Sequence, residues 1–335
     1  MNAINTFLAS ILSGINVVVN NYGWSIVVFT ILIKTILFPL DLKSRKSMRR
    51  MSMLQPQVAK LQKKYANDKE KLNQKTAELY RKERINPLSG CLPMLISFPV
   101  LIAMFAAMRM VANDALARQA IDMITTGTQH NEGWLWVKNL WMPDSPFATM
   151  IADQNSLKQI TVDIWRNVYQ SLSADQVSLL SKLQITADTI SGDTIFAALQ
   201  QSPAYISEMM TWSTMPELNL LLVKLTIYAN NNGFFILPVL AGVTQYLMTL
   251  TQPQMAGGGM PDASGNTANS TNKFMKWFFP IFSLYICSSY NAGFSIYWVA
   301  ANLISWVEGI VMNRIFEEQD KKKQTSEIAG EESMR

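Results

Sequence analysis

One positively charged side chain lies inside an apolar run, and its position suggests chemistry more strongly than any other feature of the sequence. The run is WSIVVFTILIKTILFPL, residues 24–40, and Lys34 lies near its middle. On insertion-based scales, a lysine at the centre of a membrane-spanning helix costs about 2.5–3.5 kcal/mol, which apolar neighbours can offset. Two interpretations remain open. Lys34 either faces a hydrated cavity between helices, or extends along its own helix toward headgroups about 9 Å away.

Polar side chains in the other apolar runs could complete such a cavity. The candidates are Thr30, Ser97, Gln245, Asn302 and Ser305. Thr30 precedes Lys34 by one helical turn, so both residues share a helix face. Glu308 falls close to the cytoplasmic end of the last run, and we therefore expect no carboxylate partner for Lys34 within the membrane. An unpaired ammonium in a hydrated cavity would attract an acidic ligand.

Residue types used in covalent chemistry lack the neighbours that they would need. His130 is the single histidine, and no Cys or His accompanies it, so neither a transition-metal site nor a histidine-based triad can be assembled. The glycines at 257–259 lack the strand, helix and Lys-Ser/Thr context of a phosphate-binding loop. We therefore expect neither an enzyme nor a bound cofactor.

The apolar residues occur in blocks of membrane length. The chain has 335 residues, of which 49% are hydrophobic and 16% charged. Five runs stand out, at about 23–40, 91–110, 234–251, 277–290 and 292–312. The sequence therefore predicts an all-α polytopic membrane protein with five transmembrane helices.

Basic residues in the connecting segments predict the orientation. Segment 41–89 contains 14 Lys/Arg and 5 Asp/Glu, whereas segment 111–232 contains 6 and 11. The positive-inside rule then places 41–89 in the cytoplasm and 111–232 outside. With five spans, the N-terminus is expected outside and the C-terminus in the cytoplasm.

These patterns predict ten segments in chain order. They are an outer-surface amphipathic helix (1–21), the first span (22–40), a cytoplasmic basic helical hairpin (41–89), the second span (90–110), an extracytoplasmic domain (111–232), the third span (233–251), a flexible cytoplasmic loop (252–273), the fourth span (274–290), the fifth span (292–312) and a charged cytoplasmic tail (313–335). The amphipathic helix could equally pack on the bundle or on the outer domain.

The hairpin and the outer domain carry local signals of helix ends. Asp68 is placed to cap the second hairpin helix, and Ser173 with Gln176 forms a possible capping box in a mostly helical outer domain. The hairpin methionines Met48, Met51 and Met53 could contact varied apolar ligands or could form the hairpin core. Its basic face could bind anionic lipid headgroups, ribosomal RNA or acidic partners, or could simply be solvated.

Six stretches together resemble the YidC/Oxa family of membrane protein insertases. They are residues 23–40, 48–56, 78–105, 234–248, 273–282 and 293–306, and the most specific is Asn86-Pro87-Leu88 followed by Gly90-Cys91 and Pro93. The resemblance implies five helices around a hydrophilic groove lined by Lys34, Thr30, Gln245 and Trp298, with Tyr297 and Asn302 as further candidates. The family usually has an arginine where this chain has Lys34, and residues 149–232 form an additional segment between the second and third spans.

The resemblance also implies a mechanism and partners. The hairpin would capture a nascent membrane protein, Lys34 would receive its acidic residues, and its helix would pass sideways into the lipid of a bacterial plasma membrane. Implied partners are nascent membrane proteins, the ribosome and anionic lipids, with the Sec translocon as a further candidate, and the protein would act as a monomer. Two other classes remain open, a small-solute transporter or channel and an envelope scaffold acting through the outer domain.

Overall fold

A computed structural model describes residues 2–83, 88–212, 217–220, 223–228, 230–251 and 269–332. The described chain divides into two compact units. The first unit comprises Met1–Thr30, Leu101–Ala241 and Ser283–Val299. The second unit comprises Ile31–Val100, Gly242–Phe282 and Ala300–Arg335. Helices α2, α5, α11, α12 and α13 each contribute residues to both units.

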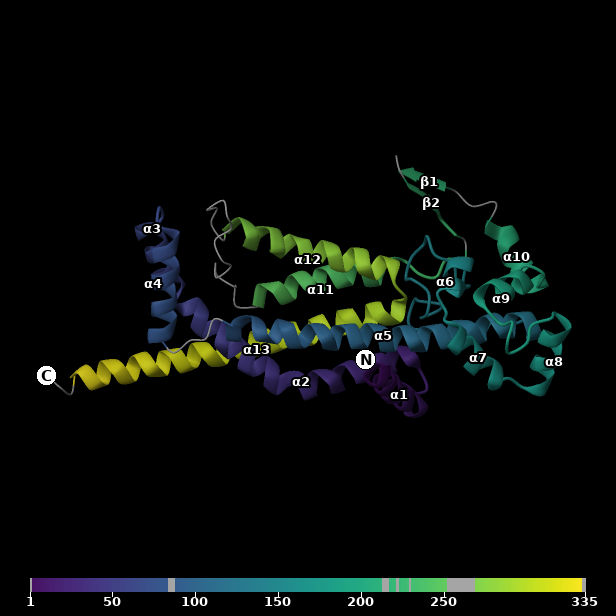
Figure 1. Cartoon of the computed structure of the whole chain (residues 1–335), viewed down its shortest axis with the longest axis horizontal. Helices are drawn as coiled ribbons and strands as arrows, with labels where there is room; N and C mark the ends of the chain where they lie inside the picture. Colours follow the sequence, from purple (N-terminus) through teal and green to yellow (C-terminus); the bar gives the residue numbers. More distant parts are fainter. Residues whose placement is uncertain are drawn as a thin grey trace. The chain divides into compact units, whose positions relative to one another are not determined.

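Helices make up nearly all of the regular structure that is described (Figure 1). In chain order the elements are α1 Asn2–Val19, α2 Tyr22–Met53, α3 Gln55–Lys64, α4 Lys69–Lys82, α5 Leu88–Thr126, α6 Gln154–Lys158, α7 Val162–Gln170, α8 Ala174–Lys182, α9 Gly192–Leu199, α10 Pro203–Trp212, β1 Glu217–Leu220, β2 Val223–Thr226, α11 Ile236–Thr251, α12 Asn269–Ser289 and α13 Ala292–Glu332.

The strands β1 and β2 are a departure from the expected all-α fold. They pair in antiparallel register, with Leu218 opposite Leu225 and Asn219 opposite Lys224. Apolar and polar residues alternate along both strands, and alternation with a period of two is the pattern of a strand rather than a helix. The outer segment is therefore mostly helical, as expected, but not entirely.

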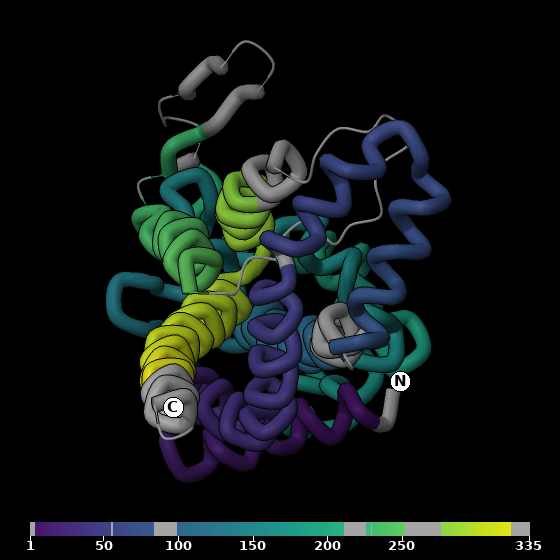
Figure 2. Tube along the Cα trace, turned by 90° about the vertical axis from the view of Figure 1, so that its left-hand side faces the viewer, coloured from purple at the N-terminus to yellow at the C-terminus, as the bar shows by residue number. Residues whose placement is uncertain are grey.

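Helices α3 and α4 form a hairpin in the second unit, and Figure 2 shows them in blue, running side by side. Leu54, Val58 and Tyr80 form a buried cluster between them, and Met51 packs against it. The side chain of Asp68 accepts a hydrogen bond from the backbone N–H of Lys71, which confirms the predicted cap of α4.

Helix α2 enters the hairpin without a break at the end of the predicted first span. It continues to Met53, although Pro39 lies within it and cannot donate a backbone hydrogen bond. Helix α13 likewise continues beyond the predicted fifth span to Glu332. The predicted tail is rich in Glu, Lys and Gln, which favour helix even where apolar periodicity ends.

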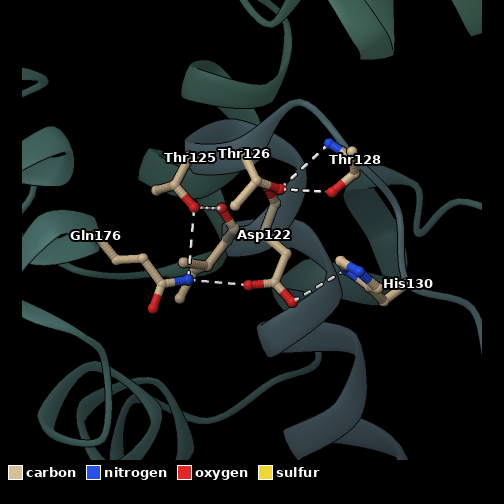
Figure 3. A network of polar contacts seen from close by, with 7 residues as sticks. Asp122, Thr125, Thr126, Thr128, His130 and Gln176 are labelled. Carbon is tan, nitrogen blue, oxygen red and sulfur yellow. Dashed lines mark hydrogen bonds and ion pairs between the residues drawn. The ribbon is translucent and has the colours of Figure 1, made fainter.

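Several outer helices pack on the second half of α5 in the first unit. The capping box predicted at Ser173 and Gln176 is confirmed at the start of α8. The same Gln176 side chain donates to Asp122 of α5 over 2.9 Å, and His130 Nδ1 lies 3.9 Å from the other Asp122 oxygen (Figure 3). One carboxylate thus connects α8, α5 and the segment that follows α5.

The ends of the outer segment meet in a narrow neck, also within the first unit. Thr149 and Asn231 form an antiparallel bridge, and Asn232 N–H donates to the Ala148 carbonyl over 2.9 Å. Asp144 accepts from the backbone N–H groups of Phe234 (2.9 Å) and Leu237 (2.7 Å). Asp144 therefore satisfies amides at the start of α11 that have no partner within the helix.

The N-terminal helix α1 shares its apolar residues between two environments. Leu8 and Leu12 are buried in the first unit, whereas Phe7, Val17 and Val18 are exposed. Packing on the protein and contact with a membrane surface are thus both compatible with α1. Residues 252–268 of the predicted cytoplasmic loop 252–273 lie outside the described residues. The remaining residues, 269–273, belong to α12.

Candidate functional site: a charged cluster on three helices

Lys34 lies in the second unit with two partners. Its Nζ donates a hydrogen bond to Ser305 Oγ of α13 over 2.6 Å and lies 3.8 Å from Asp41 Oδ2 of α2. The side chains of Lys34 and Asp41 are 21% and 24% exposed, so neither is fully enclosed by the described residues. Lys34 thus has a carboxylate neighbour just beyond the predicted end of the first span, where the expectation of no carboxylate partner within the membrane does not apply.

The reason for this partner is the continuity of α2. Asp41 follows Lys34 by about two helical turns, and residues with that spacing lie on the same helix face. The predicted boundary at residue 40 assigns Asp41 to the cytoplasmic segment, outside the first span. A long lysine side chain that leans along its own helix reaches Asp41 without another helix.

Arg45 brings a second cation into the same cluster. It is 8% exposed, and its Nη2 donates to the Ser305 carbonyl over 3.0 Å. Its Nη1 has no hydrogen-bond partner among the described residues, and the same holds for Oε2 of the nearby Glu308. Ser305 thus contacts Lys34 through its hydroxyl and Arg45 through its carbonyl.

Glycine at position 309 lets the guanidinium of Arg45 and the end of α11 approach α13. A Cβ atom at Gly309 would lie 3.1 Å from Arg45 Nη1 and would overlap the side chain of Thr251. Asn313, one turn further on, donates to the Thr251 carbonyl over 3.1 Å. Helices α2, α11 and α13 therefore meet closely around the charged residues.

Asn302 lies at the contact between α11 and α13, and Gln245 is a residue of α11. Both side chains are buried, and Asn302 Nδ2 donates to Thr244 Oγ1 over 3.4 Å. Asn302 is one helical turn from Ser305, so the amide and the Lys34 partner occupy the same stretch of α13. Of the predicted groove residues, Lys34, Gln245 and Asn302 thus belong to the second unit.

The other three predicted groove residues belong to the first unit. Thr30 is fully buried, and its hydroxyl donates to the Ile26 carbonyl of its own helix over 2.7 Å. Tyr297 is buried. Trp298 has its ring centroid 5.5 Å from that of Phe294, and its indole N–H is buried without a partner in the described part of the chain.

The hairpin methionines differ in burial, which separates the two predicted roles, hairpin core and contact with apolar ligands. Met51 packs on the hairpin core, whereas Met53 is 52% exposed and Met48 is partly buried. Met53 also lines a cavity of about 330 Å³ together with Arg49, Ser52 and Asn313. Met53 is therefore the member of this group that is most available to a ligand.

Asp41 and Arg45 are the residues that sequence reasoning missed, and Glu308 was considered and set aside. Their spacing contains a usable signal, because Lys34, Asp41 and Arg45 recur at intervals of seven and four residues, which is one helix face. No spacing in the sequence predicts that the Ser305 carbonyl and Glu308 lie near Arg45, since this depends on how α13 packs against α2.

The described helices define a class of protein first. Among them, three are long and apolar enough to cross a membrane: Tyr22–Met53, Pro99–Thr126 and Ala292–Lys322. The apolar helix Ile236–Thr251 is shorter. These lengths and compositions are those of a helical membrane protein that crosses the bilayer more than once.

Comparison with known proteins then identifies the family. The model of the family described as "60Kd inner membrane protein" matches residues 14–216 and 193–321. The chain belongs to this family, which is the YidC/Oxa family that the six sequence stretches resemble.

Three relatives, each named "Membrane protein insertase YidC", illustrate the similarity. The protein from Fusobacterium nucleatum is 52% identical over 108 residues, which are 32% of this chain and 53% of that protein. The one from Leptospira interrogans is 42% identical over 124 residues, 37% of this chain and 17% of that protein. The one from Anaeromyxobacter dehalogenans is 37% identical over 145 residues, 43% of this chain and 24% of that protein.

The matched part thus spans about half the length of the first relative and at most about a quarter of the other two. Their shared name describes insertion into membranes rather than a covalent reaction. This agrees with the expectation that the chain is not an enzyme.

Proposed function

We propose that the chain is a membrane protein insertase that moves short hydrophilic segments of nascent membrane proteins through a positively charged groove and releases their helices sideways into lipid. The observation that carries this proposal is Lys34. Its basic side chain is 21% exposed and lies in an apolar helix of membrane-spanning length in a chain of the insertase family.

In this mechanism, Lys34 lowers the cost of bringing a substrate carboxylate part-way across the membrane. A carboxylate about 4 Å from an ammonium in a hydrated site gains about 1 kcal/mol, roughly fivefold in an equilibrium constant. Lysine offers a compact charge without the planar fork of arginine, so bidentate binding of a carboxylate is not available here.

The rest of the groove remains part of the proposal. Asn302 supplies a polar group one helical turn from Ser305, the partner of Lys34, and the resemblance adds Gln245, Thr30, Tyr297 and Trp298. Met53, together with Met48 and Met51, would contact the apolar part of the substrate. Burial of about 20 apolar substrate residues in lipid supplies the driving force, so nucleotide hydrolysis is not needed.

We further propose five spans in a bacterial plasma membrane, with the N-terminus outside and the C-terminus in the cytoplasm. The charge difference between segments 41–89 and 111–232 supports this orientation. The proposed partners are ribosome-bound nascent chains, the Sec translocon and anionic lipids, and the proposed active form is the monomer.

Substitution of Lys34 tests the proposal. In proteoliposomes, Lys34→Ala should reduce insertion of a substrate with an acidic outer segment roughly fivefold, whereas Lys34→Arg should retain it because the charge remains. Lys158→Ala is the matched control, since it removes an exposed lysine of the outer segment that pairs with Asp193. Normal insertion of acidic substrates by Lys34→Ala would remove the charge from the mechanism.

The same proteoliposomes distinguish an insertase from a small-solute transporter or channel. An insertase should insert the substrate without releasing a trapped small solute. Solute release by the wild-type protein, abolished by Lys34→Ala, would favour the transporter.

A further inference from the structure

Carboxyl groups of the protein itself lie close to Lys34. Lys34 and Arg45 are the cations of the cluster, and Asp41 and Glu308 are its carboxylates. Asp41 interacts with Lys34 directly, and its charge also acts on Arg45 and Glu308. The cluster therefore contains carboxyl groups of its own before any ligand arrives.

The two contacts of Lys34 differ in kind. The 2.6 Å bond to Ser305 Oγ has the length of a good hydrogen bond, and it positions the ammonium. The Asp41 carboxylate at 3.8 Å is beyond hydrogen-bond length, so it contributes charge rather than a directed bond. An ion pair of this kind, partly exposed, is weak enough for another carboxylate to replace.

Lys34 is also the more accessible cation of the cluster. Arg45 is 8% exposed and is held by the Ser305 carbonyl and by contact with Gly309. Lys34 is 21% exposed. An acidic group that enters the cluster therefore meets Lys34 first, and there it meets Asp41 as well.

We propose that Asp41 is a specificity-determining residue that competes with acidic substrate side chains for the Lys34 ammonium. This inference rests on the proposed insertase function. A substrate carboxylate gains from Lys34 only what exceeds the interaction already made by Asp41, and it is repelled by Asp41 while both are present. Asp41 thus weakens the binding of acidic substrate side chains to Lys34 and makes the bound substrate easier to release.

Two substrates that differ in one residue measure this competition. Each is a peptide with one apolar helix of about 20 residues and a short outer segment that carries either Asp or Asn. The preference is defined as the amount of Asp peptide bound or inserted divided by the amount of Asn peptide bound or inserted. It is measured once as binding to the purified protein in nanodiscs and once as insertion into proteoliposomes.

Asp41→Asn should raise the preference for the Asp peptide about threefold in both measurements and leave the Asn peptide unchanged. The double variant Lys34→Ala/Asp41→Asn should show no such gain, because the gain needs the ammonium. Glu78→Gln, which neutralises an exposed carboxylate paired with Lys75 in the hairpin, is the matched control and should match the wild type.

An unchanged or lower preference in a folded Asp41→Asn protein would overturn the inference. Asp41→Ser, which also removes the charge, provides a second variant if the first does not fold in detergent. A raised binding preference without insertion by any variant would instead reject the insertase function and leave the competition at Lys34 supported. Normal insertion with no change in either preference would instead reject the competition at Lys34 and leave the insertase function supported.

Discussion

At the scale of single residues, Glu132 shows how burial and a hydrogen bond oppose each other in one carboxyl group. It lies after α5, outside the apolar helices, and its Oε2 accepts a hydrogen bond from Trp141 Nε1 over 2.7 Å. Burial raises the pKa of Glu132, and the bond from Trp141 lowers it less. The folded protein therefore holds the ionised form of this side chain at a cost.

This cost predicts a dependence of stability on pH. A carboxyl group with a raised folded pKa contributes stability that is complete below the ordinary value of 4.5 and is lost as the pH rises through the folded value. Glu132→Gln keeps an acceptor for Trp141 but cannot ionise. The midpoint of thermal unfolding of Glu132→Gln, relative to that of the wild type, should therefore rise steadily from pH 4 to pH 7. A difference that does not change with pH would contradict the assignment.

At the scale of elements, α9 packs against α6 through a glycine. Gly192 begins α9 next to its capping residue Ser191, whose side chain accepts from the Thr194 N–H. A Cβ atom at position 192 would overlap the Leu157 carbonyl in α6 and lie 2.8 Å from the Lys158 nitrogen. Both close neighbours are backbone atoms, so a rotamer change cannot relieve the contact.

Gly192→Ala should therefore destabilise the outer segment by roughly 1–3 kcal/mol, the usual range for overpacking. The matched control is Gly14→Ala in α1, where a Cβ atom would have no neighbour within 4 Å. That change should be neutral or stabilising, because alanine favours helix by roughly 1 kcal/mol over glycine. Thermal unfolding of both variants provides the measurement, and equal midpoints would show that α9 does not pack as described.

At the scale of the whole molecule, the neck should allow the outer segment to be deleted without disturbing the chain on either side of it. The bridge between Thr149 and Asn231 and the bond from Asn232 to Ala148 close the neck beneath residues 150–230. The segment does contribute cover to α5, because Ser202 Oγ donates to the Met123 carbonyl over 3.2 Å and Gln176 donates to Asp122.

Replacing residues 153–229 by two glycines should leave insertion within about twofold of the wild type, because the neck can still close across a short loop. The midpoint of thermal unfolding should fall, since buried residues of α5 such as Leu116 and Met123 lose cover. A monodisperse deletion variant that no longer inserts substrate would instead give the outer segment a direct part in insertion.

Local rules predicted the features that depend on a few neighbouring residues. The caps at Asp68 and Ser173 are confirmed because a cap needs only a side-chain oxygen and an amide three residues later. The strand pair was missed although its alternation is visible at 217–226, because helical signals dominate the flanking outer segment. Asp41 was missed because a segment boundary was drawn inside one continuous helix.

Apolar blocks, motif order and charge are properties of the chain alone, and they were enough to identify a helical membrane protein of the insertase family with a lysine in an apolar helix. Tertiary structure decided what the lysine contacts. Ser305 lies 271 residues away from Lys34 in the chain, and Asp41 competes for the same ammonium. The Ser305 contact follows from the packing of α13 against α2, which no spacing within the sequence specifies, whereas the spacing of Lys34 and Asp41 already places both on one helix face.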